Sequence, residues 1–298
     1  MDGPRPCLPD ELPELIAAAN QVFRPSGGDM ARDYPLLFSE ANAVNLTVVR
    51  DAAGIVAHAG LCLRRALLHG VSVAVAAVGA VFTRESMRGR GLGSAVVAGA
   101  LDQARATGSD LVLVSGDGPL YRRLGFISGP AAHAWACPAP ATADPNDRRA
   151  PPAAVDTFDL RPAGDADMPL LARIYDAEPV RFVRDAADWR ALMRSGVVFA
   201  WPGQIWVVTA AGAPAGYLAV TRGTRRRVFE LAGDRDALIA AAPQVSDDVV
   251  VPAHDEEMER DLRARGWQCR PVTLPAGHQW LQPPPRPLPV PWYGLNYV

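Results

Sequence analysis

A glycine- and arginine-rich segment in the first half of the chain is the clearest candidate for chemistry. It follows an apolar run and comprises Arg88, Gly89, Arg90, Gly91, Leu92, Gly93 and Ser94. Glycines let a backbone turn tightly and bring its N–H groups close to a ligand, and a helix beginning near Ser94 adds the positive end of its dipole. The two arginines add positive charge beside those donors. The pattern predicts a loop that binds phosphate, and a pyrophosphate in particular.

Other phosphate-binding loops fit this segment less well. A dinucleotide loop of the G-x-G-x-x-G type needs glycine where Ser94 stands and an acidic residue at the end of the next strand, whereas Asp110 precedes that strand. A P-loop needs lysine, and all 30 basic residues of the chain are arginine. The same absence excludes a PLP Schiff base and a kinase-type lysine. For the segment taken alone, a glycine turn that binds nothing is the remaining alternative.

A second motif follows the first. The apolar run Leu111–Ser115 leads into GDGPLYRRLGF, in which Tyr121 opens a helical turn that Gly125 and Phe126 end. Together the two motifs resemble the GNAT superfamily of N-acetyltransferases, whose acetyl-CoA loop reads R/Q-x-x-G-x-G/A and whose later signature reads Y-x-x-x-G-F. Both occur here in the family's order and on the expected elements. The resemblance covers residues 1–135.

This resemblance implies acetyl-CoA as the co-substrate and no metal. The pyrophosphate would lie on the backbone amides from Arg88 to Ser94. The pantetheine arm would pair like an extra strand with the backbone of Val81, Phe82 and Thr83. Tyr121 would act as the general acid, protonating the CoA thiolate after a neutral amine attacks the thioester directly. The alternative for Tyr121 is a packing role beneath the cofactor.

The general base stays open at this stage. A solvated or capping role is typical of each acidic side chain in this half, and Asp117 in particular resembles a helix cap before Pro119. The C-terminal carboxylate is a further candidate, because the chain ends on an aromatic segment and some multidomain relatives bring their C-terminus to the active site. The candidates are Asp29, Asp33, Glu40, Glu85, Asp117 and the carboxylate of Val298.

The hydrophobic pattern supplies a scaffold for these residues. It predicts helices over about 10–22 and 94–106, a loop-rich stretch over 24–43, strands over 45–50, 55–65, 72–83 and 111–115, and a short helix from 118. A mostly antiparallel meander feeding one strand–loop–helix–strand crossover indicates a mixed α/β (α+β) unit flanked by helices.

A weak internal repeat predicts a second unit of the same fold. Arg5-Pro6 matches Arg161-Pro162 and Gly60 matches Gly216, each at an offset of 156 residues. The second copy carries acidic residues (Asp234 and Asp236) where phosphate should bind, and Leu262 where the tyrosine should stand. The sequence therefore predicts a catalytic GNAT domain over 1–137, a Pro/Ala/Asp-rich linker over 138–157, a degenerate GNAT-like domain over 158–282 and a Pro-rich aromatic tail over 283–298.

Composition limits the partners. A net charge of -2 gives no electrostatic reason to expect nucleic acid or an anionic membrane, and the scattered Cys and His residues show no metal-ligand spacing. The absence of a long apolar run or a basic leader favours a cytoplasmic protein. We expect a small-molecule amine as acceptor, with specificity in the loop from Arg24 to Glu40. A protein- or peptide-acetylating enzyme and a regulatory module that binds acetyl-CoA without turnover are the alternatives.

Overall fold

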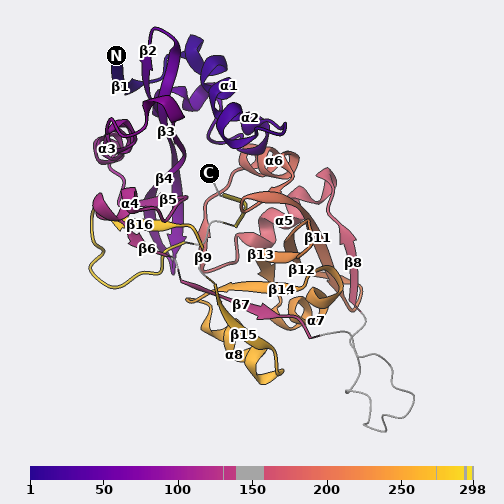
Figure 1. Cartoon of the computed structure of the whole chain (residues 1–298). Helices are drawn as coiled ribbons and strands as arrows, with labels where there is room; N and C mark the ends of the chain where they lie inside the picture. The colour runs from indigo at the N-terminus through magenta and orange to yellow at the C-terminus, as the bar shows by residue number, and fades with distance from the viewer. Residues whose placement is uncertain (130, 139–157, 273, 292–293, 297–298) are drawn as a thin grey trace.

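The computed structural model describes residues 1–129, 131–138, 158–272, 274–291 and 294–296. They form two units with the same order of elements, each built on a mixed eight-stranded sheet flanked by helices (Figure 1). The predicted fold class is confirmed. None of the helices in these stretches is long and apolar enough to cross a membrane.

The first unit follows the elements predicted for it. Its strands are β1 (Asp2–Pro6), β2 (Leu46–Asp51), β3 (Gly54–Leu68), β4 (Val71–Thr83), β5 (Leu111–Val114), β6 (Ile127–Ser128) and β7 (Ala132–Ala136). Its α-helices are α1 (Leu12–Phe23), α2 (Met30–Asp33), α3 (Leu92–Ala106) and α4 (Pro119–Arg123), with 3-10 turns η1 (Pro9–Glu11), η2 (Glu40–Asn45) and η3 (Glu85–Met87). The sequence did not predict the short strands β1, β6 and β7, and β3 extends beyond its predicted end. At the site, α3 begins at Leu92 with Gly91 as its N-cap, so Ser94 lies inside the helix.

The second unit repeats the main elements of this order, with two additional short strands, β9 and β10, and without counterparts of η2 and η3. Its strands are β8 (Phe158–Pro162), β9 (Val180–Phe182), β10 (Val197–Val198), β11 (Trp201–Ala210), β12 (Ala213–Thr221), β13 (Arg227–Gly233), β14 (Asp248–Pro252), β15 (Gln268–Val272) and β16 (Gly277–Trp280). Its helices are α5 (Met168–Tyr175), α6 (Ala186–Ser195), α7 (Arg235–Val245) and α8 (Glu256–Ala264), with 3-10 turns η4 (Asp165–Asp167) and η5 (Gly294–Asn296).

The two units exchange their last strands. The first sheet has the order β1-β2-β3-β4-β5-β16-β6, and its eighth strand, β9, pairs with β3. The second has the order β10-β11-β12-β13-β14-β7-β15, and its eighth strand, β8, pairs with β11. In Figure 1 the yellow β16 accordingly lies beside the magenta β5, and the magenta β7 lies beside β14 and β15. Sheet membership thus cuts across the predicted domains, since β7 falls within 1–137 and β16 within 158–282. Residues 139–157 of the predicted linker lie outside the described part of the chain.

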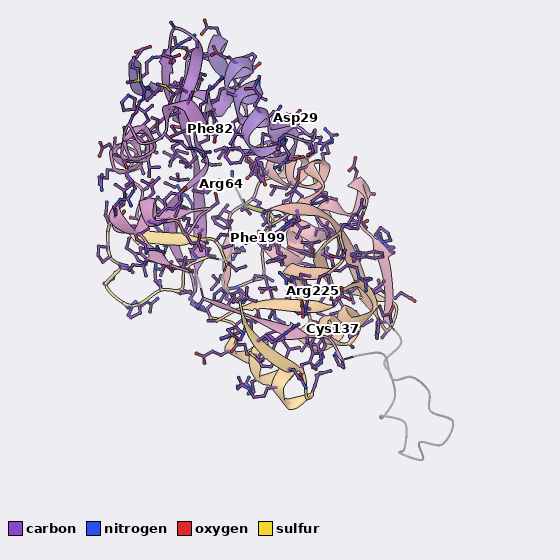
Figure 2. All side chains as sticks on the ribbon, viewed as in Figure 1. Asp29, Arg64, Phe82, Cys137, Phe199 and Arg225 are labelled. Atoms are coloured by element: carbon purple, nitrogen blue, oxygen red, sulfur yellow. The ribbon has the colours of Figure 1, made fainter. Side chains whose placement is uncertain are left out.

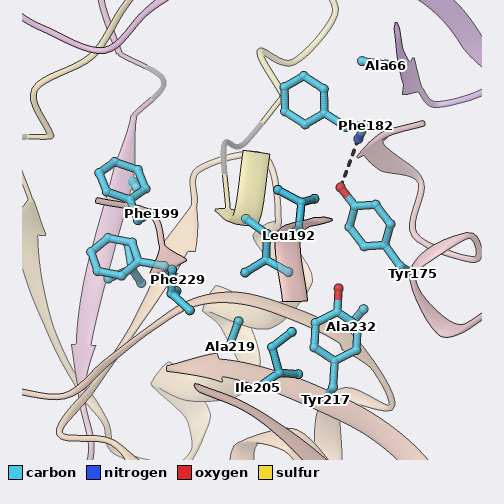
Figure 3. Packing of buried hydrophobic residues seen from close by; sticks show 14 of the residues in the cluster. Ala66, Tyr175, Phe182, Leu192, Phe199, Ile205, Tyr217, Ala219, Phe229 and Ala232 are labelled. Carbon is cyan, nitrogen blue, oxygen red and sulfur yellow. Dashed lines mark hydrogen bonds between the residues drawn. The ribbon is translucent and has the colours of Figure 1, made fainter. Parts of the chain in front are cut away.

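A shared core fastens the units together. Ala66, at the end of β3, pairs with Phe182 of β9, and one buried cluster runs from this strand pair to Trp189 and Tyr217 in the second unit. Figure 3 shows this cluster, with the hydroxyl of Tyr175 accepting a hydrogen bond from the Phe182 N–H. Burial of apolar surface on both sides of the junction stabilises the arrangement of the two units.

A bidentate ion pair explains why the Arg-Pro repeat recurs. The guanidinium of Arg5 donates to both oxygens of Glu11, each at 2.8 Å. In the second unit Arg161 donates to both oxygens of Asp167, at 2.7 and 2.6 Å. In each unit the carboxylate lies six residues after the arginine and ends the 3-10 turn before the first helix. The sequence repeat therefore reflects a shared structural device.

Candidate active site

The site begins where β4 and β5 separate. The parallel pairing of these strands ends at Val78 and Val114, after which the Ser115 N–H donates to the carbonyl of Val78 at 3.0 Å. Directly beyond this point β4 carries a bulge against β3, and Ala80 adopts a φ of 51°, in the left-handed region. A bulge re-aims the residues that follow it and is common beside active sites.

The bulge leaves one edge of β4 unpaired. The Arg84 N–H donates to the carbonyl of Val56 on β3 at 2.8 Å. Because N–H groups alternate sides along a strand, that of Phe82 also faces β3, whereas those of Val81 and Thr83 face the gap beyond β5. No described strand pairs with the β5-side edge of β4 beyond Val78. An extended chain in the gap could therefore accept hydrogen bonds from Val81 and Thr83, and Phe82 would contribute no such donor.

The predicted phosphate loop occupies the N-terminus of α3. Gly91 is the N-cap with a φ of 77°, and no side chain caps the helix. The N–H groups of Leu92, Gly93 and Ser94 belong to the first turn and lack intrahelical acceptors. Arg88 and Arg90 are exposed next to this turn. Uncapped donors, the helix dipole and two cations together favour binding of an anion at this end of α3.

Three parts of the site meet at Gly93. A Cβ built on this glycine would lie 3.4 Å from the hydroxyl oxygen of Thr83 and 3.8 Å from the side chain of Leu120. The loop, the free edge of β4 and helix α4 therefore converge, although residues 83, 93 and 120 are well separated in the sequence.

Tyr121 lies beside this convergence. Its ring packs against Gly116, where an added Cβ would lie 2.5 Å from the ring, and it meets Phe126 edge-on with 6.0 Å between centroids. Burial raises the pKa of the Tyr121 phenol to about 12. Because of this raised pKa, the phenol is protonated at neutral pH. Its hydroxyl forms no hydrogen bond among the described residues, so it is free to donate one.

Most of the candidate general bases have structural roles. Asp29, labelled in Figure 2, caps α2 by accepting from the Ala31 N–H at 2.9 Å, as its sequence position suggests. Asp33 accepts from Arg24 at 2.9 Å. The expectation that Asp117 caps α4 is wrong, because Gly118 occupies the N-cap and no side chain bonds there. A helix starting with Pro119 already lacks one donor, which reduces the need for a cap.

The remaining base candidates gain no support. Glu40 and Glu85 are exposed to solvent. The carboxylate of Val298 lies outside the described residues. Nowhere in the described ranges do three or more His, Cys, Asp or Glu gather to hold a metal ion.

A cavity of about 600 Å³ opens between the units. The first unit contributes residues 24–33, part of the loop predicted to select the acceptor, and the second contributes the end of α6 and the strands β10 and β11. Pocket residues Arg222 and Gln204 come from the second unit, and no sequence signal singled them out. The cavity has the size of a small-molecule site.

The second unit has an equivalent strand bulge but lacks a long loop before its helix and an open cleft. β13 has a bulge at the equivalent place, at Phe229, and its pairing with β14 likewise stops just before the bulge. However, only Asp234 separates β13 from α7, whereas residues 84–91 separate β4 from α3. The remaining space between the ends of β13 and β14 is about 60 Å³.

Internal carboxylates fill the place of an anion in this second cleft. Glu178 accepts from the Gly233 N–H at 2.9 Å and from Arg235 at 2.7 Å. Arg235 also donates to Asp255 at 3.1 Å. The donors near the start of α7 are therefore already satisfied from within the chain.

Comparisons with known proteins agree with the first unit's geometry. Residues 4–128 match the family model described as an acetyltransferase (GNAT) domain. No curated protein matches the chain.

Similar folds occur among solved structures. A GCN5-related N-acetyltransferase from Kribbella flavida aligns with a TM-score of 0.62 at 15% identity, over 93% of this chain and 70% of that one. A GCN5-related N-acetyltransferase from Anabaena variabilis aligns with a TM-score of 0.66 at 16% identity, over 93% and 72%. A conserved protein from Enterococcus faecalis, titled a probable N-acyltransferase, gives 0.66 at 12%, over 92% and 71%. At these identities the likeness is one of fold, and it spans both units.

Proposed function

We propose that the protein is an acetyl-CoA-dependent N-acetyltransferase that transfers acetyl directly to a primary amine of a small molecule. The convergence of the uncapped start of α3, the free edge of β4 and helix α4 around Gly93 carries the proposal. The first feature suits a pyrophosphate, the second suits the amide groups of a pantetheine arm, and the third brings Tyr121 beside them. The match of residues 4–128 to an acetyltransferase domain supports this interpretation.

The reaction follows from these positions. The nitrogen of a neutral amine attacks the thioester carbonyl, and an N–H of the β4 bulge region donates to the developing oxyanion. The C–S bond breaks as the N–C amide bond forms, and the thiolate takes the proton of the Tyr121 phenol. The attacking nitrogen loses a proton to solvent, and solvent reprotonates Tyr121. No covalent acetyl-enzyme is required.

The second unit has a supporting role in this proposal. It lacks the loop between β13 and α7, its cleft is closed by the Glu178–Arg235 pair, and Leu262 replaces the tyrosine. It supplies strand β16 to the catalytic sheet and one wall of the cavity between the units. A concave cavity of about 600 Å³ between the units favours a small acceptor over a protein surface.

Titration calorimetry with acetyl-CoA, followed by an amine and peptide panel monitored for free CoA, tests the proposal. We expect one equivalent bound per chain and CoA release with small amines. Two equivalents would show that the second unit also binds the cofactor. Binding without transfer to any amine would indicate a regulatory module, release with peptides alone would indicate a protein acetyltransferase, and absence of binding would overturn the enzymatic function.

A further inference from the structure

The cavity between the units has an uneven charge. Three arginines and one carboxylate are the charged side chains among its described lining residues: Arg24, Arg32, Arg222 and Asp33. Three positive charges against one negative charge leave +2. Polar groups otherwise come from Gln204, Ser195 and the backbone. A cavity of this charge attracts anions and repels polycations.

Asp33, the one carboxylate among the described lining residues, forms ion pairs with two of the arginines. Asp33 accepts from the Nε of Arg24 at 2.9 Å and from the Nη2 of Arg32 at 3.1 Å. Its side chain is only 10% exposed, whereas that of Arg32 is 66% exposed. Asp33 therefore orients the two guanidinium groups and has little capacity left to neutralise a ligand cation, while Arg32 keeps donors that face solvent.

Arg222 faces the cavity from the second unit with no acidic partner among the described residues. Its Nη2 donates to the amide oxygen of Gln204 at 2.8 Å. A neutral partner fixes the direction of the guanidinium and leaves its charge uncompensated. Arg222 is therefore the cation best placed to form a charge-assisted hydrogen bond with a ligand oxyanion.

The C-terminal end of helix α6 contributes a partial negative charge to the cavity wall. Helix α6 ends at Ser195, and Ser195 and Gly196 line the cavity. The end of a helix carries the equivalent of roughly half a negative charge, which is smaller than the +2 of the side chains. It can favour an ammonium group locally without reversing the overall preference for an anion.

The cavity wall is linked to the β4 bulge through packed apolar side chains. Arg24 directly follows Phe23, whose ring contacts the ring of Phe82 with 6.2 Å between centroids. Val197 of the cavity wall packs on the apolar cluster that contains both Phe82 and the bulge residue Ala80. A ligand in the cavity would therefore lie against a wall residue that packs on the same apolar cluster as the β4 bulge.

We propose that the acceptor is an amine that also carries an oxyanion, a carboxylate or a phosphate, and that Arg32 and Arg222 bind this oxyanion. The inference rests on the proposed acetyl transfer and narrows its substrate class. It excludes polycationic amines as the preferred acceptors. Binding of the oxyanion between the two units positions the amine toward β4.

Matched acceptor pairs test the proposal in the full chain with saturating acetyl-CoA. One set compares amino acids with their amides, and the other compares phosphoethanolamine with ethanolamine, each scored by kcat/KM and by calorimetric binding in the presence of CoA. We expect the anionic member to be preferred by about tenfold or more, the size of a charge-assisted hydrogen bond. Whichever set shows the larger preference identifies carboxylate or phosphate as the oxyanion.

Substitutions of the cavity arginines test whether the cavity causes the preference for anionic acceptors. Arg222→Gln and Arg32→Gln should each raise the KM for the anionic acceptor about tenfold while leaving the KM for acetyl-CoA unchanged. Arg105→Gln, at the far end of α3 and 52% exposed, is the matched control and should change neither value.

Three outcomes would overturn the substrate class while acetyl-CoA still binds: equal use of both members of each pair, preference for polyamines, or failure of every anionic member to bind or react. Loss of acetyl-CoA binding by wild type would instead remove the proposed function itself. The two failures are therefore distinguishable in one set of measurements.

Discussion

Tyr121 and Leu262 occupy the same place in the two units, and only one of them carries an acidic proton. The Phe126 N–H donates to the carbonyl of Tyr121 at 3.0 Å, and the Trp267 N–H donates to the carbonyl of Leu262 at 3.0 Å. In both turns the residue before the donor is a glycine in the left-handed region, with φ of 88° and 76°. The backbone is thus retained while the side chain differs, so the turn itself does not depend on the phenol.

We therefore expect Tyr121→Phe to lower kcat by about 10²–10⁴, the contribution of a general acid, with unchanged affinity for acetyl-CoA. Since the hydroxyl has no hydrogen-bond partner in the described structure, the free energy of unfolding should change by less than about 1 kcal/mol. With a pKa of about 12, the phenol of the wild type stays protonated through neutral and mildly alkaline pH. Steady-state kinetics over that pH range measure the loss in kcat, and urea denaturation measures the change in the free energy of unfolding.

Tyr175→Phe is the matched control. The Tyr175 hydroxyl accepts from the Phe182 N–H at 3.0 Å in the second unit. Its removal should cost about 1 kcal/mol of stability and leave kcat unchanged. If Tyr121→Phe retained full activity, Tyr121 would have only a packing role.

The two ends of α3 offer a matched pair of glycines. Gly91 and Gly108 have φ of 77° and 72°, and nothing lies within 4 Å of a Cβ built on either. Gly91→Val and Gly108→Val should each lose about 1–2 kcal/mol of stability from backbone strain. Only Gly91→Val should weaken acetyl-CoA binding, by tenfold or more, because only Gly91 precedes the free N–H groups. Calorimetry showing equal affinities for the two variants would contradict the phosphate loop.

Acid should weaken the first unit through Glu11. Hydrogen bonds from Arg5, helped by the Leu8 N–H and Arg50, lower the pKa of this buried carboxyl from 4.5 to about 2. A lowered pKa in the folded state stabilises the fold above pH 4.5, and this stabilisation is lost as the pH falls toward 2. A shift of this size corresponds to about 3 kcal/mol.

Glu11→Gln should accordingly be less stable than wild type at neutral pH by up to about 3 kcal/mol, with the difference closing over that acidic window. Urea denaturation at a series of pH values measures it. Glu40→Gln, at an exposed position, is the control and should follow wild type. If the free energies of unfolding of wild type and Glu11→Gln differed by the same amount at every pH in this range, the lowered pKa of Glu11 would not stabilise the fold.

A buried ion pair anchors the end of the chain that the structure describes. Arg184 donates to both oxygens of Glu230 at 2.8 and 2.7 Å, and Glu230 also accepts from the Leu295 N–H at 2.8 Å. Glu230→Gln should cost about 3–5 kcal/mol, because it leaves a buried guanidinium without its counter-charge. The double change with Arg184→Met should recover most of the loss, as thermal denaturation would show. No recovery would mean that packing dominates. Glu230 holds Leu295 through its N–H, and Leu295 lines the cavity. We therefore expect Glu230→Gln also to raise the KM for the acceptor.

Local signals explain what the sequence could predict. The loop around Gly91, the start of α4 before Tyr121 and the meander of β2–β4 depend on glycines, on a turn signature and on apolar periodicity, all of which act over a few residues. The Arg5-Pro6 repeat was also visible in the sequence, although its cause, the ion pair with Glu11, became clear only in the structure.

Other features depend on contacts that no short window contains. Ala80 has no intrinsic preference for a positive φ, so the bulge follows from how β4 fits between β3 and β5. The partners of the short strands β7 and β16 are decided by tertiary packing. Arg222 joins Arg24 in one cavity only because the two units pack together, and an exposed arginine in a turn gives no sign of this.

The exchange of β7 and β16 makes each half of the molecule an obligate partner of the other. Residues 1–137 made alone would lack the strand between β5 and β6, and residues 158–298 alone would lack the strand between β14 and β15. Each polypeptide would expose two sheet edges where it now has a continuous ladder, which invites aggregation. Produced together, the two polypeptides should reconstitute one particle by strand complementation. The second unit thereby serves as an inbuilt folding partner of the first.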